Sequence, residues 1–446
     1  MDMVSTLNWR NGALALACAA ALTACGGGSN NVVEITPEPT QPGDGEDPHD
    51  HDPVAAAGRL IALEANSAQI HAIDLEHGSV LQTFTSDHAS SALYASPGQR
   101  YAVLLQRNQN QAQFIDGGVW QEDHGDHLHD YTQAPALLNL RLTGVRPTHY
   151  ETHGAHAALF FDGDASSGDK ASIALFSDAS IAAGQAGLVE ASHTLGSAMH
   201  GTAEPRGDWL LTTWKPVDST STTPTHVELH HRHGDHFHME KRFEQECPGL
   251  HGSYSNVRYS VFGCTDGVLV VEQNGDNFTA RKVANPASMP AGVRIGTITG
   301  NPHYDKFVGI ASPGWLYEID PEAGTITTIN WAEGRTRRAH AIDAEGDNLL
   351  VLDDLGSLHI LDMHSWGKRA EITSAIAHMP SAAPFPSIAV SQAAETAWLS
   401  DPNGQRLTSI DLHAAKLGEH IALNFSPTSI VWLGISEPSA DHAHDH

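Results

Sequence analysis

Two segments of the chain carry the same six-residue pattern of metal-binding residue types. Residues 124–129 read His-Gly-Asp-His-Leu-His, and residues 233–238 read His-Gly-Asp-His-Phe-His. Imidazole with an occasional carboxylate is a ligand set that Zn²⁺ accepts, and Cu²⁺ and Ni²⁺ compete for the same imidazoles. The pattern therefore predicts transition-metal binding, with zinc favoured. The expected ligands are His124, Asp126, His127, His129, His233, His236 and His238.

The order of residues within the pattern predicts how the ligands converge. Alternate residues of an extended segment share a face, so His127 and His129 can bind one ion while Leu128 packs beneath them. Gly125 allows the backbone to fold back toward His124. Acidic, histidine-rich loops also occur without a function, but duplication of the whole pattern favours metal binding.

The overall composition narrows the classes of partner. The chain has 446 residues with 30 His, 24 Lys plus Arg, and a formal net charge of −29. Nucleic-acid binding needs a basic face, so this charge argues against it, and also against electrostatic binding to an anionic membrane. An acidic surface fits the attraction of cations and also fits simple solubility.

The N-terminal residues predict export. Arg10 precedes an apolar run over 13–22, which is too short to span a bilayer. The run ends in a Leu-Thr-Ala-Cys sequence at Cys25, which resembles a bacterial lipoprotein signal. We therefore expect 1–25 to be the signal and Cys25 to be lipidated, which places the protein in the periplasm on a lipid anchor. Gly26 carries no inner-membrane retention signal, so the outer membrane is favoured.

The remainder divides by composition into three parts. Residues 26–56 are rich in Pro, Gly and acids without an apolar period, which predicts a disordered linker. Residues 57–436 are expected to form the folded domain, and 437–446 a tail rich in His and Asp. The His-Asp-His-Asp sequence at 49–52 and the tail could both bind metal weakly and exchangeably.

The sequence pattern of the folded part is typical of an all-β repeat protein. Short β-rich runs alternate with Gly, Asp, Asn and Pro turns, and the best helix candidate is the single stretch 180–191. Four-strand units recur every 40 to 50 residues or so, which is typical of a β-propeller. The last strand, 428–433, is expected to pair with the first strands after Gly58 and close the ring. Eight blades are favoured and seven are the alternative; a two-sheet sandwich rarely needs this many residues.

Four histidines occupy the same register in four repeats. Each precedes a strand by eight or nine residues: His149, His200, His251 and His340. Such positions lie near the central channel of a propeller, where imidazoles from different blades can bind zinc tetrahedrally. His153 flanks the first of them and is included as a ligand. The alternative is that these histidines hydrogen-bond neighbouring blades around a wet channel.

Four cysteines are present, of which Cys18 leaves with the signal and Cys25 is the lipid site. The remaining pair, Cys247 and Cys264, is expected to form a disulfide in an oxidising compartment. A two-thiol metal site is the alternative, because Cys247 lies four residues before His251.

These motifs together resemble the AztD-like periplasmic zinc chaperones over most of the chain after the linker. The carriers are the two His-rich loops, the Cys-Pro-Gly-Leu-His-Gly stretch at 247–252 with Cys264, and the His-rich N-terminal segment. The resemblance implies a propeller that passes zinc to the substrate-binding protein of an ABC importer. It implies ligand roles first for His124, His127, His129, His200 and His251, and then for His233, His236 and His238.

Three functions compete at this point. The favoured one is zinc capture and delivery without catalysis. The second is a metal-dependent hydrolase or oxidoreductase, which needs an open metal position and a base such as Asp126, Asp235 or Glu204. Neither a Gly-x-Ser-x-Gly elbow nor a Cys-x-x-Cys-His haem site occurs in the sequence. The third is an interaction scaffold on which metal binding is incidental.

Overall fold

The structure is a computed structural model that describes residues 57–125 and 127–436. The expected signal with Cys25, the linker, the C-terminal tail and Asp126 lie outside the described residues. Within the described part, the helices are too short and too polar to cross a lipid bilayer.

The first sheets in the chain are antiparallel and up-and-down. One contains β1 (Arg59–Glu64), β2 (Gln69–Asp74), β3 (Ser79–Thr85) and β35 (Pro427–Leu433). The next contains β4 (Ala92–Ala95), β5 (Tyr101–Gln106), β6 (Gln111–Asp116), β9 (Ala136–Leu137) and β10 (Leu142–Thr143). A separate hairpin consists of β7 (Val119–Asp123) and β8 (Leu128–Thr132).

An eight-stranded sheet follows. It contains β11 (Pro147–His153), β12 (His156–Phe161), β13 (Ser172–Ser177), β14 (Ala191–Thr194), β15 (Ala203–Arg206), β16 (Trp209–Trp214), β17 (His226–His233) and β18 (His236–Arg242). It consists of two four-stranded meanders that join through one parallel bridge, Ser192 to His236. Because this bridge merges the two meanders into one sheet, the preference for eight blades over seven stays a prediction.

Four further four-stranded sheets complete the described chain. The first contains β19 (Ser253–Ser255), β20 (Tyr259–Cys264), β21 (Gly267–Asn274) and β22 (Asn277–Ala284). The second contains β23 (Ile295–Gly300), β24 (Phe307–Ala311), β25 (Trp315–Asp320) and β26 (Thr325–Ile329). The third contains β27 (Arg337–Ile342), β28 (Asn348–Asp353), β29 (Leu358–Asp362) and β30 (Lys368–Ile372). The fourth contains β31 (Ile388–Val390), β32 (Thr396–Asp401), β33 (Arg406–Asp411) and β34 (Lys416–Ala422).

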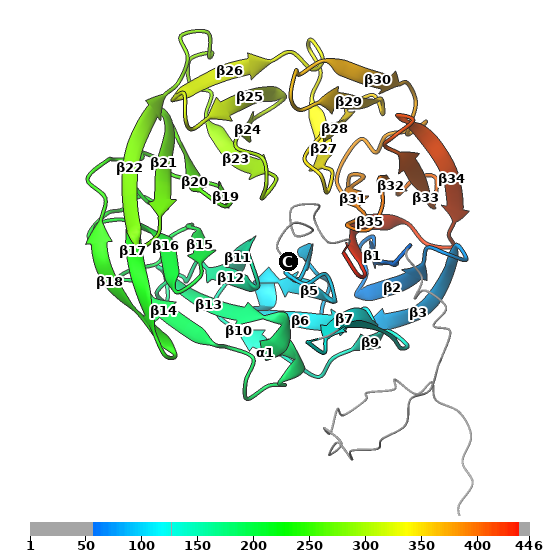
Figure 1. Ribbon diagram of the computed structural model, residues 1–446, viewed down its shortest axis with the longest axis horizontal. Coiled ribbons are helices and arrows are strands. Elements are labelled where there is room, and N and C mark those ends of the chain that lie inside the picture. The colour runs from blue at the N-terminus through cyan, green and yellow to red at the C-terminus, as the bar shows by residue number, and fades with distance from the viewer. Residues whose placement is uncertain (1–56, 126, 437–446) are drawn as a thin grey trace, which may run out of the picture. The chain divides into compact units, whose positions relative to one another are not determined.

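These sheets follow one another around a ring, which confirms the predicted propeller (Figure 1). The ring closes as predicted, because β35 pairs with β1 with Leu60 opposite Trp432. Trp432 also donates its indole N–H to the carbonyl of Ala57 at 2.9 Å. Closure removes two exposed sheet edges that could otherwise pair with other chains.

Apolar clusters lie between neighbouring sheets rather than in one central core. Tyr101 and Phe114 of one sheet, for example, pack with Leu159 and Phe176 of the next. Middle strands such as β5 are therefore buried on both faces and read as continuous apolar runs. The first strand lies innermost in sheets such as those of β19, β23 and β27, whereas β35 takes this place in the sheet that closes the ring (Figure 1).

The expected helix over 180–191 is wrong in extent. The α-helix α1 spans only Asp178–Ala182, and Ser177 caps it by accepting a hydrogen bond from the Ser180 backbone N–H. Gly184 follows with a positive φ of 81°, which ends the helix. A short 3₁₀ turn, η1 (Arg107–Gln109), connects β5 to β6.

Candidate metal centre

Three histidines from three consecutive inner strands meet at one point. His149 lies in β11, His200 lies just before β15, and His251 lies just before β19. These three strands are neighbours around the ring (Figure 1). Nε2 of His200 is 2.9 Å from Nε2 of His251 and 3.4 Å from Nε2 of His149. The three ligand atoms lie within 4.8 Å of one another. The shared register therefore brings together three of the four histidines that it aligned.

In two of these rings, the other nitrogen, Nδ1, is hydrogen-bonded to an oxygen acceptor. Nδ1 of His200 lies 2.9 Å from a carboxylate oxygen of Asp162, and Nδ1 of His251 lies 2.6 Å from the carbonyl oxygen of Gly296. Because both partners accept, each Nδ1 carries the proton and each Nε2 presents a lone pair. Lone pairs this close repel unless a cation lies between them. Tetrahedral zinc with bonds of about 2.0–2.1 Å would space its ligands about 3.3 Å apart, which the cluster matches.

Electrostatics keep this cluster ready for a cation. Burial lowers the pKa of His149 to about 3, and the neighbouring His200 and His251 add to this effect. Burial also lowers the pKa of His251. Burial of Asp162 opposes its ionisation, yet hydrogen bonds from His200 and Arg107 outweigh it and hold the pKa of Asp162 below its usual value. Neutral imidazoles at His149 and His251 and an ionised carboxylate at Asp162 are the protonation states that metal binding requires.

Two predicted ligands do not join the cluster. His340, in β27, lines the same cavity of about 460 Å³, but its Nδ1 lies 3.1 Å from a guanidinium nitrogen of Arg337. Nε2 of His153 lies 3.0 Å from a guanidinium nitrogen of Arg206. A fixed positive charge beside each ring disfavours a second cation there. The structure therefore supports the channel ligands His149, His200 and His251 and gives His340 and His153 other partners.

The first His-rich segment forms the tip of the β7–β8 hairpin. The ring centroids are 5.4 Å apart for His124 and His127, and 5.8 Å apart for His124 and His129. Gly125 adopts a φ of 90°, which turns the chain at the tip. The expectation that Leu128 packs is wrong, because its side chain is 53% exposed. The hairpin forms its own two-stranded sheet, and the β7 residues next to its tip, Gln121 to Asp123, are exposed as well.

The second His-rich segment connects β17 to β18 and behaves as the pattern predicts. Phe237 is only 6% exposed and packs into an apolar cluster of the eight-stranded sheet. His236 and His238 flank it on the opposite, exposed face, with their Nε2 atoms 2.8 Å apart. The second hairpin is therefore anchored, because β17 and β18 belong to the eight-stranded sheet and Phe237 packs into one of its apolar clusters.

The structure adds two ligand candidates to the second hairpin that the sequence pattern missed. His231, His233 and Glu240 form a group with ligand-atom separations within 4.8 Å, and Nδ1 of His231 is 3.2 Å from Nε2 of His233. His231 pairs across the strands with His238. A signal was available, since His231 shares the strand period of two with His233.

Cys247 and Cys264 form the predicted disulfide, with Cα atoms 4.9 Å apart, and this excludes the alternative two-thiol metal site. The bond joins the loop before β19 to the end of β20. The backbone N–H of His251, in that loop, donates to the carbonyl of Gly263 at 3.0 Å. The disulfide therefore clamps the segment that positions one channel ligand.

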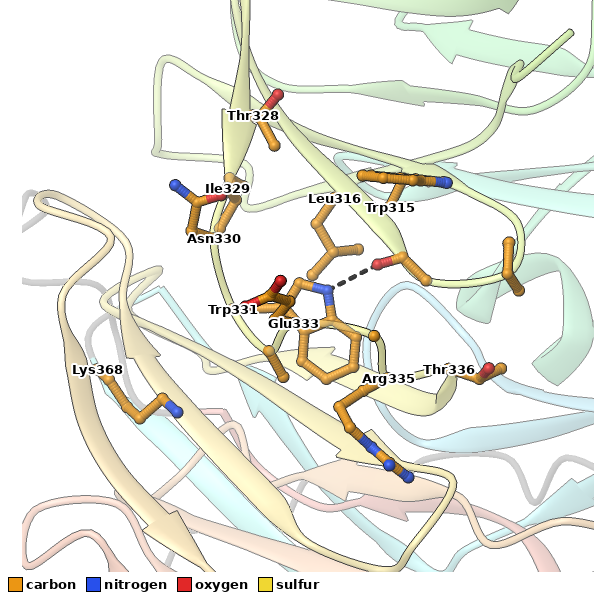
Figure 2. A pocket seen from close by; sticks show the side chains of 14 residues that line it. Trp315, Leu316, Thr328, Ile329, Asn330, Trp331, Glu333, Arg335, Thr336 and Lys368 are labelled. Carbon is orange, nitrogen blue, oxygen red and sulfur yellow. Dashed lines mark hydrogen bonds between the residues drawn. The ribbon is translucent and has the colours of Figure 1, made fainter. Parts of the chain in front are cut away.

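A larger cavity, of about 700 Å³, lies between the edges of the sheets that contain β25 and β30. Trp331 lies at its centre and donates its indole N–H to the carbonyl of Gly314 at 2.7 Å (Figure 2). Arg335 and Lys368 supply positive charge to its wall and Glu333 negative charge, and none of the residues that line it is a histidine. This cavity therefore lacks the imidazole ligands that the channel cluster has.

We expect Asp162→Asn to weaken zinc binding by roughly 10–100-fold, the usual effect of losing an outer-shell partner. The amide keeps the size of the side chain but removes the charge that orients and polarises His200. Asp164→Asn is the matched control, since Asp164 pairs with Arg146 and contacts none of the three histidines. Competitive zinc titration of both variants checks this. Equal affinities would show that Asp162 does not tune the site.

The metal-free protein should lose stability as the pH falls below 6.5, partly through His340. Burial lowers the pKa of His340 to about 3 from a usual 6.5, and Arg337 adds to this effect. Between these values the unfolded chain binds a proton that the folded chain does not, so the free energy of unfolding falls by up to about 1.4 kcal/mol per pH unit. His340→Gln, which does not titrate, should flatten this slope in urea unfolding at several pH values. An unchanged slope would contradict the assignment.

Comparison with known proteins supports the fold and the predicted resemblance. No protein-family model matches the chain. The zinc chaperone AztD of Citrobacter koseri is 24% identical over 402 residues, which cover 87% of this chain and 90% of that protein. Two solved structures of Citrobacter koseri AztD, one of the apo protein, superpose with a TM-score of 0.73 at 22% identity, covering 85% of this chain and 98% of theirs.

A more distant structure shares the architecture. Dihydro-heme d1 dehydrogenase NirN superposes with a TM-score of 0.56 at 13% identity, covering 87% of this chain and 77% of that chain. These structural likenesses establish the propeller fold. The resemblance to AztD-like proteins that the sequence motifs predicted is thus confirmed.

Proposed function

We propose that this protein is a periplasmic zinc metallochaperone, which captures Zn²⁺ and delivers it to the substrate-binding protein of an ABC zinc importer. The observation that carries the proposal is the convergence of three Nε2 atoms, from His149, His200 and His251, at spacings that suit one tetrahedral ion. Similarity to a zinc chaperone over most of the chain supports the same reading.

The two kinds of histidine site suit capture and transfer in different ways. The channel cluster supplies three protein ligands and leaves a fourth position of a tetrahedral ion for water or for an incoming ligand. An incoming ligand can therefore begin exchange before any imidazole leaves. The exposed histidines of the two hairpins offer incomplete ligand sets at the surface, where zinc can bind and leave quickly.

The envelope location is part of the proposal. Disulfides persist in oxidising compartments such as the periplasm, and this chain contains one between Cys247 and Cys264. The lipid anchor at Cys25 is proposed from the signal sequence. An anchored chaperone would hold zinc close to the membrane rather than carry it over long distances.

Catalysis is the competing proposal, because three histidines and an open position also occur in zinc hydrolases. Two of the candidate bases are badly placed for it. Asp235 pairs with His236 in the outer hairpin, and Glu204 is only 1% exposed. We therefore assign the cluster to zinc binding.

The test is a comparison of transfer with release. Zinc-loaded protein is mixed with a metal-free substrate-binding protein of a zinc importer, and separately with metal-free carbonic anhydrase or a chelator. Direct delivery predicts that the importer protein gains zinc faster than zinc dissociates into the chelator, while carbonic anhydrase gains it at the dissociation rate. Equal rates for all acceptors would reduce the protein to a zinc buffer. Turnover of an activated ester by the loaded protein would favour the enzyme.

A further inference from the structure

The cavity around Trp331, called here the Trp331 cavity, lies beside the cavity that contains the histidine cluster. Arg337 contacts both. Its backbone N–H donates at 3.3 Å to the carbonyl of Pro313, which lines the Trp331 cavity. Its guanidinium lies 3.1 Å from Nδ1 of His340, which lines the histidine cavity. A protein bound over the Trp331 cavity would therefore lie next to the zinc ligands.

Strand pairing also places the Trp331 cavity at the same end of its sheet as the histidine cluster. The carbonyl of Gly296, in β23, lies 2.6 Å from Nδ1 of His251. The neighbouring Ile295 pairs with Ala311 in β24, and Ala311 pairs with Trp315 in β25. Neighbouring strands are about 4.8 Å apart, so the backbone of Trp315 lies only about 10 Å from β23. A partner that contacts Trp315 is thus within reach of the cluster.

Large apolar side chains are exposed at this end of the sheets. Trp315, which lines the Trp331 cavity, is 40% exposed (Figure 2). Leu355 is 67% exposed and follows Asp354, whose carboxylate accepts a hydrogen bond from Arg335 in the cavity wall. Tryptophan and arginine are the side chains that most often dominate protein–protein binding. The exposed groups therefore have the composition of a binding surface.

The wall of the Trp331 cavity is nearly balanced in charge. Arg335 pairs with Asp354 at 2.5 Å, and Lys368 pairs with Glu371 at 2.6 Å. Glu333 is a further acid in the wall. An excess of positive charge must therefore come from residues outside the wall.

Three guanidinium groups between the two cavities supply that excess. Arg294 immediately precedes β23, and Arg337 and Arg338 begin β27. They contact a backbone carbonyl, a histidine and an aromatic ring, and none of them pairs with a carboxylate in the described part of the chain. The whole chain carries a formal net charge of −29. This basic region therefore favours an acidic partner.

We propose that five residues form the docking surface for the protein that receives the zinc. We call this surface the mouth patch, and it consists of Trp315, Leu355, Arg294, Arg337 and Arg338. The partner presents acidic side chains to the guanidinium groups and an apolar side chain to the Trp331 cavity, whose volume of about 700 Å³ accommodates one. This inference rests on the proposed function and adds the surface and the charge of the partner.

The test measures docking separately from transfer. Zinc-loaded protein is titrated with the metal-free substrate-binding protein of a zinc importer, and calorimetry gives the docking affinity while stopped-flow mixing gives the transfer rate. Trp315→Ala should weaken docking and slow transfer by more than about tenfold, with the affinity for zinc alone unchanged. Leu355→Ala, at a more exposed position, should act in the same direction. Arg338→Gln should slow transfer and reduce its dependence on salt, because salt screens the attraction of charges.

Matched controls lie at the other end of the strands. Val257 is 65% exposed and follows β19, whereas His251 precedes that strand. Arg369 donates to Asn348 at the start of β28, and like Arg338 it pairs with no carboxylate in the described part of the chain. Val257→Ala and Arg369→Gln should leave docking and transfer unchanged.

The outcomes separate the mouth patch from the proposed function. Unchanged docking in Trp315→Ala would overturn the mouth patch and leave zinc delivery intact. Docking that Trp315→Ala weakens, with transfer no faster than zinc dissociation, would support the mouth patch and count against delivery. Docking that strengthens about tenfold after removal of residues 26–56 would assign the surface to the chain's own acidic segment. A dimer that Trp315→Ala dissociates would assign it to a second copy, and either result would overturn the proposal.

Discussion

Replacement of His200 by alanine is expected to abolish tight zinc binding. His200 is the middle member of the cluster, with its Nε2 at 2.9 Å from His251 and 3.4 Å from His149. Its removal leaves two imidazoles in the cluster. It also takes away the histidine that the carboxylate of Asp162 contacts. Since loss of an outer-shell partner alone costs roughly 10–100-fold in affinity, loss of this direct ligand should cost more than about 100-fold. Competitive titration against a chelator of known affinity measures it.

His340→Ala is the matched control for this experiment. His340 lines the same cavity but is held by Arg337 rather than by the cluster. Its removal should leave the tight zinc affinity unchanged within about twofold, a difference too small to represent a lost ligand. If His340→Ala weakened zinc as strongly as His200→Ala, the ligand set would differ from the three histidines named here. Tight binding that survived His200→Ala and disappeared with the outer hairpins would contradict the channel site.

The second large effect is expected from removal of the disulfide. The double variant Cys247→Ser, Cys264→Ser should lose about 3 kcal/mol of unfolding free energy, as the loop-closure model gives for a loop of this size. The two cysteines are 17 residues apart, and both are fully buried in an apolar cluster. Two hydroxyls in that cluster add to the loss, because they are poorer partners for apolar neighbours. Urea unfolding of the metal-free protein measures the change.

The same variant should also bind zinc less tightly. The disulfide clamps the loop that carries His251, and a looser loop must be ordered when the ion binds. Zinc in excess should restore part of the lost stability, since a ligand that binds only the folded state stabilises it. An unaltered zinc affinity in a destabilised variant would show that the hydrogen bond from His251 to Gly263 positions the loop without the disulfide.

The local features of this chain were predictable because their causes are local. Turn residues and β-rich runs mark each strand, and the recurrence of four strands indicates a propeller. The apolar last strand ending at Leu433 was correctly expected to pair with the first strands, because a ring without closure would leave two open edges. The spacing that aligned His149, His200 and His251 follows from the same repeat. The pairing of Cys247 with Cys264 followed from their number and compartment.

Contacts between repeats were decided by the tertiary structure alone. The sequence by itself determined the propeller, its closure and the register that aligns the histidines, since these depend on strand periods and turn chemistry along the chain. It could not tell that the Nε2 atoms of His149, His200 and His251 converge, whereas Arg337 holds the ring of His340. Nor could it tell that Phe237 is buried while Leu128, at the same place in the motif, is exposed. Ligand convergence and burial depend on distance across the ring, and a register repeated in every blade carries no information about that distance.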